Sequence, residues 1–287
     1  MPLVNLWTAA RRMICGRAFP SIEYPLETER RLNDLHGRAP VDKHLRALFQ
    51  NDVIGTENYV DLFWRCLNQT ATPVTPFNLF HRFQSRRDLV RYFLATLSLP
   101  GARAECGVYR GASALLLAHA WRSAQAGFRG KGFFLIDSFV GTSASGEHDL
   151  IPVRGDDGTP RHEAFFPVAK ADISPQLVRG FFGEFPETSI CAGWIPEVLA
   201  TLPERDWSFV HLDVTLYEPT LGALEYFYPR LNPGGIIVCD GSIFCPGARK
   251  AWDEFCDLRN LPFVVLGNRE TVLIKPASGG HTDTAFA

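Results

Sequence analysis

From residue 103 onward the chain alternates between short apolar runs and helix-forming segments, and this alternation limits the fold more than any other feature of the sequence. The runs that predict strands are 103–109, 132–139, 188–194, 207–214 and 234–241. The segments that predict helices are 112–126, 175–185, 196–202, 218–231 and 247–258. Strands that alternate with helices predict an α/β domain whose parallel sheet is covered by helices on both faces.

The last two apolar runs, 262–267 and 271–276, stand too close together for a helical crossover and predict an antiparallel hairpin. The sequence therefore predicts a doubly wound, seven-stranded, mostly parallel sheet with an antiparallel last strand. This architecture resembles the Rossmann-like fold of class I S-adenosylmethionine-dependent methyltransferases. A plain dinucleotide-binding domain is usually parallel throughout.

The first 100 residues differ from the rest and have apolar residues at helical spacing. The segments with this spacing are 43–50, 57–67 and 85–98. Pro73 and Pro76, in the stretch TATPVTP, are incompatible with the interior of a regular helix. We expect three regions: an N-terminal helical extension or lid (1–100), a donor-binding core (101–276) and a flexible tail (277–287).

Composition excludes several classes of protein. Apolar residues make up 46% and charged residues 21%, which is ordinary for a globular enzyme. The formal net charge of -2 leaves no basic excess for nucleic acid, and no apolar run approaches the roughly 18 residues of a membrane span. The seven cysteines, which include Cys106, Cys191 and Cys239 in expected strands, form no C-x-x-C pair. We expect reduced thiols in a cytoplasmic protein that binds neither nucleic acid nor membrane.

Acidic residues stand at or near the ends of four of the five expected parallel strands. They are Glu105, Asp137, Asp213 and Asp240. Ligands of open α/β sheets bind outside the carboxyl ends of the strands, so these side chains converge on the expected site. A carboxylate in an apolar strand costs several kcal/mol unless it is paired or binds a ligand.

The stretch ECGVYRG combines Glu105 with two glycines, Gly107 and Gly111. Gly107 permits a tight turn with close backbone approach, and Gly111 opens a helix whose N-terminal amides favour negative charge. Glu105 can accept hydrogen bonds from an ammonium group or from the loop, and Asp137 can accept two from ribose hydroxyls. S-adenosylmethionine carries both an amino-acid end and a ribose. A nicotinamide cofactor would call for G-x-G-x-x-G, whereas the spacing here is G-x-x-x-G.

Further donor-binding candidates surround these residues. They are Tyr109, Arg110, Ser113, Ser138, Phe139, Gly193, Trp194 and Asp213. Trp194 fits stacking on adenine as well as simple core packing. Arg110 fits contact with the donor carboxylate as well as a solvated position.

Several segments together resemble the macrocin O-methyltransferase family, whose members methylate sugar or aromatic hydroxyls of bacterial natural products. They are 105–118, 136–141, 192–203, 211–241 and 246–255, within a match over roughly 75–258. The resemblance implies S-adenosylmethionine as donor, O-methylation, and a magnesium site with Asp213 and Asp240 as ligands. Thr215 and Gly241 stand where the family pattern has further acids, which leaves the need for magnesium open.

The resemblance also implies that Asp213 is the catalytic base. His211 is a second candidate base, and a core histidine is the alternative. His81 and His162 lie in segments expected above the site, where exposed surface histidines are the simpler interpretation. The long, polar segment 140–172 predicts a lid or a disordered insertion.

Three hypotheses follow. The first is an O-methyltransferase that acts on a small molecule, such as a sugar or aromatic group of a natural product. The second keeps the donor but replaces O-methylation by N-methylation or by non-methylating chemistry. The third is a retired methyltransferase that serves as a binding subunit. The acceptor and the oligomeric state are left open, with a homo-oligomer among the options.

Overall fold

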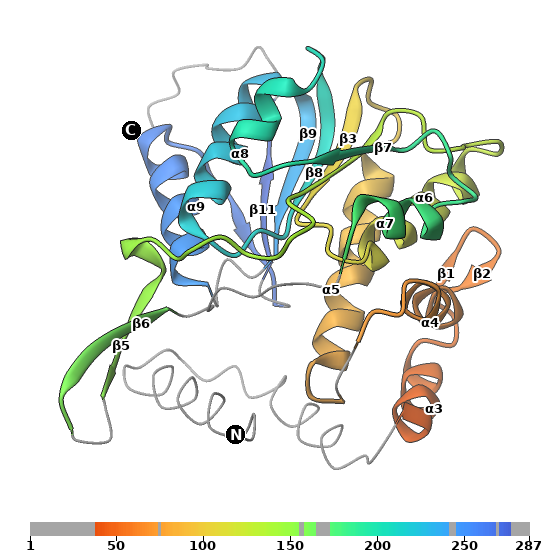
Figure 1. Cartoon of the computed structure of the whole chain (residues 1–287). Coiled ribbons are helices and arrows are strands. Elements are labelled where there is room, and N and C mark those ends of the chain that lie inside the picture. Colours follow the sequence, from red (N-terminus) through yellow and green to blue (C-terminus); the bar gives the residue numbers. More distant parts are fainter. Residues whose placement is uncertain are drawn as a thin grey trace, which may run out of the picture.

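A computed structural model of the protein describes residues 38–73, 76–154, 158–164, 173–240, 245–267 and 270–276. Its central sheet has seven strands in the order β10-β11-β9-β8-β3-β4-β7 (Figure 1). In chain order the strands are β3 (Ala102–Cys106), β4 (Phe133–Asp137), β7 (Ser189–Ala192), β8 (Trp207–Leu212), β9 (Leu231–Cys239), β10 (Val264–Val265) and β11 (Thr271–Ile274). Strand β11 pairs antiparallel with both β9 and β10, and the other pairings are parallel. The predicted fold class is confirmed.

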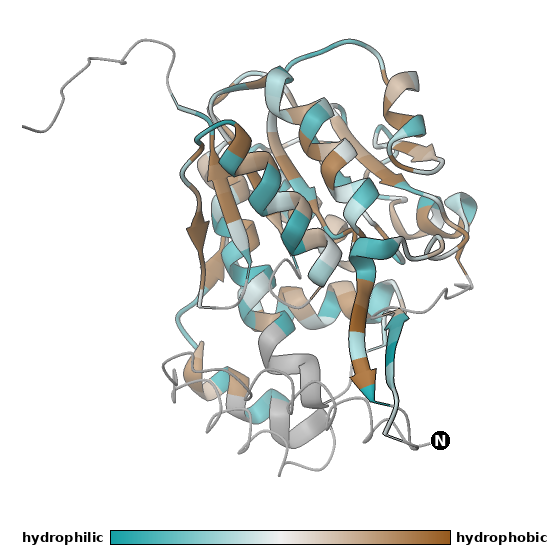
Figure 2. Ribbon diagram, turned by 90° about the vertical axis from the view of Figure 1, so that its left-hand side faces the viewer, coloured by the Kyte–Doolittle hydropathy of each residue, from teal (hydrophilic) through white to brown (hydrophobic). Residues whose placement is uncertain are grey.

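Helices cover both faces of this sheet (Figure 1). One face carries α8 (Tyr217–Arg230) and α9 (Pro246–Leu258), and the other carries α5 (Pro76–Ala95) and α6 (Ala112–Ala124). Two more helices extend this second layer, α4 (Tyr59–Gln69) and α7 (Pro175–Phe181). Figure 2 shows largely apolar strands between helices of mixed hydropathy, as expected for a sheet buried on both faces.

Strand β8 is buried on both faces of the sheet. All of its residues are buried. Phe209 meets Phe93 of α5 at a ring-centroid distance of 5.2 Å on one face, and Trp207 meets Phe227 of α8 at 4.9 Å on the other. Because both faces are covered, the strand is apolar along most of its length rather than alternating.

The N-terminal part differs in detail from the expected helices. It contains α3 (Arg38–Leu48) and a short hairpin, β1 (Val53–Ile54) and β2 (Glu57–Asn58), before α4. Pro76 is the first residue of α5, where a missing N–H costs no helical hydrogen bond, so this helix begins earlier than residue 85. Side chains of α3, α4 and α5 share one hydrophobic core with the sheet. The division into three regions stays a prediction, and residues 1–37 and 277–287 lie outside the described part of the chain.

The segment 140–172 contains regular structure instead of a plain loop. A 3-10 turn (Glu147–Asp149) leads into an antiparallel hairpin, β5 (Leu150–Arg154) and β6 (Pro160–Ala164). The hairpin projects from the body of the molecule below α9 in Figure 1. The buried Asp149 carboxylate accepts hydrogen bonds from the N–H groups of Gly146 (2.9 Å) and Tyr217 (2.8 Å), which ties the base of the hairpin to the start of α8.

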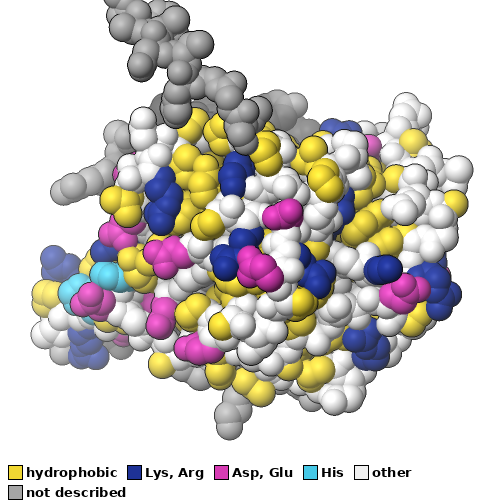
Figure 3. Space-filling model, turned by 90° about the horizontal axis from the view of Figure 1, so that it is seen from above, with side chains coloured by type: hydrophobic (Ala, Val, Ile, Leu, Met, Phe, Trp, Pro, Cys, Tyr) yellow, Lys and Arg dark blue, Asp and Glu magenta, His cyan; other side chains and the backbone are white. Residues whose placement is uncertain are grey.

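The surface and the thiols agree with the composition. Seen from above, positive and negative side chains intermix and form no single basic patch on this face (Figure 3). The described cysteines are reduced, and Cys191 is half-buried while Cys106 and Cys239 are buried. Among the described helices, none is long and apolar enough to cross a membrane.

His119 is a buried titratable group at the interface of α4 and α6. Its ring lies 3.1 Å from an Arg65 nitrogen and 2.9 Å from an Arg122 nitrogen, and it packs edge-on against Phe185. Burial and the two guanidinium groups lower the pKa of His119 from 6.5 to about 4. The folded state therefore holds this ring neutral, while the unfolded state protonates it below about pH 6.5.

We expect the His119→Gln variant to lose less stability than the wild type when the pH is lowered. Because the folded pKa is depressed, the stability due to the neutral ring is present above about pH 6.5 and is lost as the pH falls toward 4, by on the order of a few kcal/mol. Urea unfolding at pH 7.5 and pH 5 would measure this in both proteins. Equal pH dependence in the two would contradict the expectation.

Candidate functional site

The glycine turn between β3 and α6 lies against the end of β8. Gly107 and Gly111 have φ values of 84° and 86°, and Tyr109 between them has a φ of 50°. A Cβ atom on Gly107 would stand 2.2 Å from the carbonyl oxygen of Asp213. The close approach that we expected toward a ligand is thus an approach to the backbone of the neighbouring strand end, and only glycine permits it.

Asp137 at the end of β4 organises the adjoining loops. One carboxylate oxygen accepts the N–H of Tyr109 at 2.8 Å, and the other accepts the N–H of Phe139 at 2.7 Å. Both contacted residues have positive φ, so the carboxylate holds two loops in conformations that non-glycine residues rarely adopt. The Ser138 hydroxyl also lies 3.4 Å from the oxygen that accepts the Phe139 N–H, so the oxygen that accepts the Tyr109 N–H has room for one further hydrogen bond. The carboxylate therefore fits a ribose hydroxyl.

Glu105 lies deeper than a ligand-contacting residue would. Its side chain is fully buried, accepts a hydrogen bond from the Ser113 hydroxyl at 2.7 Å, and lies 3.2 Å from Nδ1 of His211. Glu105 therefore links the start of α6 to β8. His211 is also fully buried, so the structure favours the core-histidine interpretation over that of a base in contact with an acceptor.

The remaining donor candidates differ in exposure and in their contacts. Arg110 donates from Nε to the carbonyl of Thr70 at 2.7 Å, which joins the glycine turn to the end of α4. The Ser138 hydroxyl caps the carbonyl of Gly141 at 2.7 Å, and Phe139 is buried. Trp194 is 45% exposed, which excludes simple core packing and leaves its face accessible. The assignment of these residues to donor binding stays a prediction.

Two of the four strand-end acids share a cation that the sequence analysis did not single out. The Arg86 guanidinium of α5 contacts Asp213 and Asp240, each with a nitrogen–oxygen distance of 2.9 Å. It also lies 3.8 Å from the fully buried Glu270. The Arg86 side chain is 8% exposed, compared with 31% for Asp213 and 16% for Asp240.

The position of Arg86 carried a signal in the sequence. Phe83, Arg86, Val90 and Phe93 fall on the helical spacing of one buried face of α5. An arginine in such an apolar stripe requires carboxylate partners, because an unpaired buried charge is expensive. The stripe points to a buried ion pair but does not reveal its partners.

Burial and neighbouring charges shift the pKa values of this cluster in opposite directions. Burial lowers the pKa of Arg86, but the carboxylates of Asp240, Asp213 and Glu270 outweigh it and raise that pKa above its ordinary value. Burial and the Asp240 charge raise the pKa of Asp213, while Arg86 opposes this shift. As they stand, Asp213 and Asp240 do not fit a magnesium ion between them, because one oxygen of each already contacts the guanidinium.

A cavity of about 510 Å³, part of it open to solvent, joins the glycine turn to this cluster. It lies between α4, α5 and the start of α6, and its lining includes Arg82, Arg86, Gly107, Tyr109, Ser113 and Asp213. Because that volume includes open solvent, the space that water-sized molecules can occupy is only about 50 Å³, which is below the range of small-ligand sites. The structure thus brings the donor and acceptor candidates to one hollow at the sheet edge.

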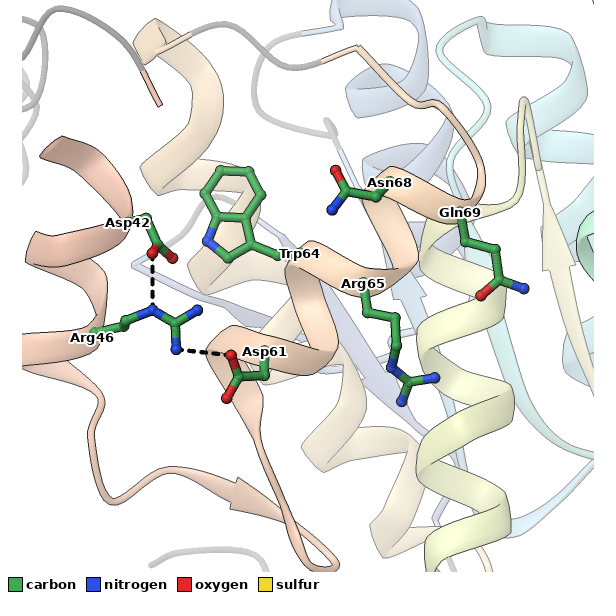
Figure 4. A pocket seen from close by; sticks show the side chains of 7 residues that line it. All are labelled: Asp42, Arg46, Asp61, Trp64, Arg65, Asn68 and Gln69. Atoms are coloured by element: carbon green, nitrogen blue, oxygen red, sulfur yellow. Dashed lines mark hydrogen bonds and ion pairs between the residues drawn. The ribbon is translucent and has the colours of Figure 1, made fainter. Parts of the chain in front are cut away.

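Other candidates lie elsewhere. His162 is exposed on β6, and the side chain of His81 is outside the described part of the structure. A second, shallow pocket on α3 and α4 is drawn in Figure 4, where Arg46 pairs with Asp42 and Asp61 beside Trp64. None of the strand-end acids lines that pocket.

A protein family can be assigned from the part of the sequence that runs from α5 to β10. A model described as macrocin-O-methyltransferase (TylF) matches residues 81–266. The chain belongs to this family. The predicted resemblance is confirmed, and the matched range holds Arg86 and the four strand-end acids.

Relatives of the macrocin O-methyltransferase family extend the comparison. Demethyldecarbamoylnovobiocin O-methyltransferase of Streptomyces niveus is 28% identical over 162 residues, which is 55% of this chain and 59% of that protein. A tetracenomycin rhamnosyl 4'-O-methyltransferase of Streptomyces olivaceus is 28% identical over 159 residues, 54% of this chain and 59% of that protein. The alignments thus span less than two thirds of these relatives.

Solved structures agree on the fold. The O-methyltransferase NovP superposes with a TM-score of 0.55 at 20% identity, over 68% of this chain and 80% of that one. The calicheamicin methyltransferase CalS11 gives a TM-score of 0.52 at 20% identity, over 75% and 91% of the two chains. The seven-stranded architecture is therefore common to this chain and to both methyltransferases.

We expect Gly107→Ala to destabilise the protein more than Gly127→Ala. Both glycines have φ values near 85°, but a Cβ on Gly127 would meet nothing within 4 Å. The left-handed backbone alone costs about 1–2 kcal/mol, and the clash with Asp213 adds about 1–3 kcal/mol. Urea unfolding of both variants gives the difference directly. Equal losses in the free energy of unfolding would show that the backbone at Asp213 can move away from the added Cβ without loss of stability.

Proposed function

We propose that this protein is an S-adenosylmethionine-dependent O-methyltransferase that acts on a hydroxyl group of a small molecule. The observation that carries the proposal is Asp137, whose carboxylate joins the glycine turn to the end of β4 and accepts one hydrogen bond on Oδ2, which leaves that oxygen able to accept a ribose hydroxyl. Membership of the macrocin O-methyltransferase family supports the same donor and reaction.

The donor side of the proposed site uses three features of the chain. Asp137 accepts a hydrogen bond from a ribose hydroxyl, and Trp194 offers an exposed face for stacking. The start of α6, preceded by Gly111, directs backbone N–H groups at the negatively charged amino-acid end. When bound, S-adenosylmethionine supplies an electrophilic methyl group on a positively charged sulfur.

On the acceptor side, Asp213 is the proposed base. With the donor bound, the acceptor hydroxyl oxygen would take its methyl group, and the donor would leave as a neutral thioether that keeps the bonding pair. The hydroxyl proton passes to the Asp213 carboxylate and then to solvent. Burial and Asp240 raise the pKa of Asp213 against the opposing charge of Arg86, and a raised pKa makes the carboxylate a better proton acceptor.

The relatives narrow the proposed acceptor. Their names describe methylation of a novobiocin precursor and of a rhamnosyl group of tetracenomycin. A sugar or aromatic hydroxyl of a natural product is therefore the acceptor class we propose. N-methylation, non-methylating chemistry and a retired binding subunit are the alternatives. Cytoplasmic location and a homo-oligomer stay predictions.

Donor binding can be tested without knowledge of the acceptor. We expect S-adenosylhomocysteine to bind by calorimetry in the presence of a chelator. Its 2'-deoxyribose analogue should bind about tenfold or more weakly, because a hydrogen bond to a charged acceptor is lost. Use of one protein with two ligands removes any effect on folding. No binding of either ligand would favour the retired binding subunit.

Transfer to oxygen is the second test. With methyl-labelled donor and a panel of rhamnosides and phenols, we expect labelled O-methyl product by mass spectrometry and NMR. Asp213→Asn should lower kcat about 10²–10⁴-fold with little change in affinity for S-adenosylhomocysteine. Asp253→Asn, on the far side of α9, is the matched control and should keep its rate. Label on nitrogen, or an unchanged rate for Asp213→Asn, would contradict the proposed chemistry.

A further inference from the structure

The end of the sheet that faces the cavity has an excess of buried acid. Glu105 and Glu270 are fully buried, and Asp213 and Asp240 are partly so. His211, Asp240 and Glu270 each bring one potential ligand atom to within 4.8 Å of the others. Such a group requires a cation, either a bound ion or a side chain.

Arg86 supplies a cation to these acids. One guanidinium nitrogen contacts Asp213 at 2.9 Å, and a second contacts Asp240 at 2.9 Å and lies 3.8 Å from Glu270. The planar guanidinium presents several donors in a fixed geometry, so it can bridge carboxylates from two strand ends at once. It also keeps its proton at all pH values at which the protein folds.

A divalent ion at the same oxygens would have to displace the guanidinium. The displaced charge would remain in a buried setting, since the side chain is 8% exposed and reaches the cluster from the middle of α5. That displacement costs several kcal/mol unless new partners are found. The sequence adds no further acid beside these two, because Thr215 lies two residues after Asp213 and Gly241 directly follows Asp240.

We propose that the Arg86 guanidinium takes the place of a divalent metal ion between Asp213 and Asp240, so that this protein holds its acceptor-side carboxylates without a metal. Arg86 is then a positioning residue, because it acts through Asp213. The assignment of Asp213 to the acceptor side rests on the proposed function, whereas the cation site itself does not.

The decisive measurement is Mn²⁺ binding, by electron paramagnetic resonance, to the full-length protein without donor or acceptor. We expect no stoichiometric Mn²⁺ in the wild type. We also expect its affinity for S-adenosylhomocysteine to agree within about twofold in chelator and in magnesium, since no metal contributes to the site. One Mn²⁺ per chain that is lost in Asp213→Asn would overturn the proposal.

Removal of the guanidinium should create the metal site. We expect Arg86→Ala to gain one Mn²⁺ per chain, with affinity at least about tenfold above the wild type, because the carboxylates lose their compensating charge. The gain should disappear when Asp240→Asn is added. Arg86→Met keeps the apolar stem and serves if the alanine variant does not fold. A folded variant of either kind that gains no Mn²⁺ would overturn the proposal.

Two controls separate this inference from general charge effects and from the proposed function. Arg91→Gln removes a positive charge from the same helix, where Arg91 is 53% exposed and pairs with Asp52, and should gain no Mn²⁺. Arg86→Lys keeps the charge and should also remain without metal. If S-adenosylhomocysteine fails to bind the wild type, the proposed function fails, while the Mn²⁺ result still decides the role of Arg86.

Discussion

The ion pairs of Arg86 are the constraint on which the sheet edge depends. They connect the middle of α5 to the ends of β8 and β9 and, at 3.8 Å, to Glu270 just before β11. Four elements that are distant in sequence therefore meet at a single planar group. Partners of this kind are costly to separate, because the loss of one leaves the others charged and buried. Arg86 thus supplies the positive charge that favours the ionised forms of Asp213 and Asp240 at this edge.

The proposed donor half of the edge uses a different principle. The Asp137 carboxylate is stabilised by the backbone N–H groups of Tyr109 and Phe139. These contacts hold two left-handed residues in place before any ligand arrives. A loop that is ordered in advance loses less conformational entropy on binding, which favours affinity. One half of the edge is thus organised by charge and the other by backbone geometry.

The sequence predicted the sheet and its acids because apolar runs mark parallel strands and their ends. Asp137, Asp213 and Asp240 follow from this pattern. Arg86 did not, because its partner Asp213 is 127 residues away and periodicity does not encode such a contact. The role of Gly107 was likewise assigned to a ligand, whereas the nearest obstacle is a neighbouring strand end. The hairpin within 140–172 was missed because neither strand is buried: β6 is polar and mostly exposed, and β5, although mainly apolar, is at most half-buried and too short to show a clear alternation.

The anchoring of that hairpin has a consequence for how the family can diversify. The Asp149 carboxylate accepts a hydrogen bond from the N–H of Tyr217 at the start of α8. It also lies so close to Gly247 in α9 that a Cβ atom on Gly247 would overlap the carboxylate. The base of the hairpin is therefore fixed by one carboxylate at the beginnings of two helices. An insertion or deletion at the tip of the hairpin, beyond Asp149, would leave this anchor in place. The length of this hairpin can therefore vary while the attachment of its base to the starts of α8 and α9 is kept.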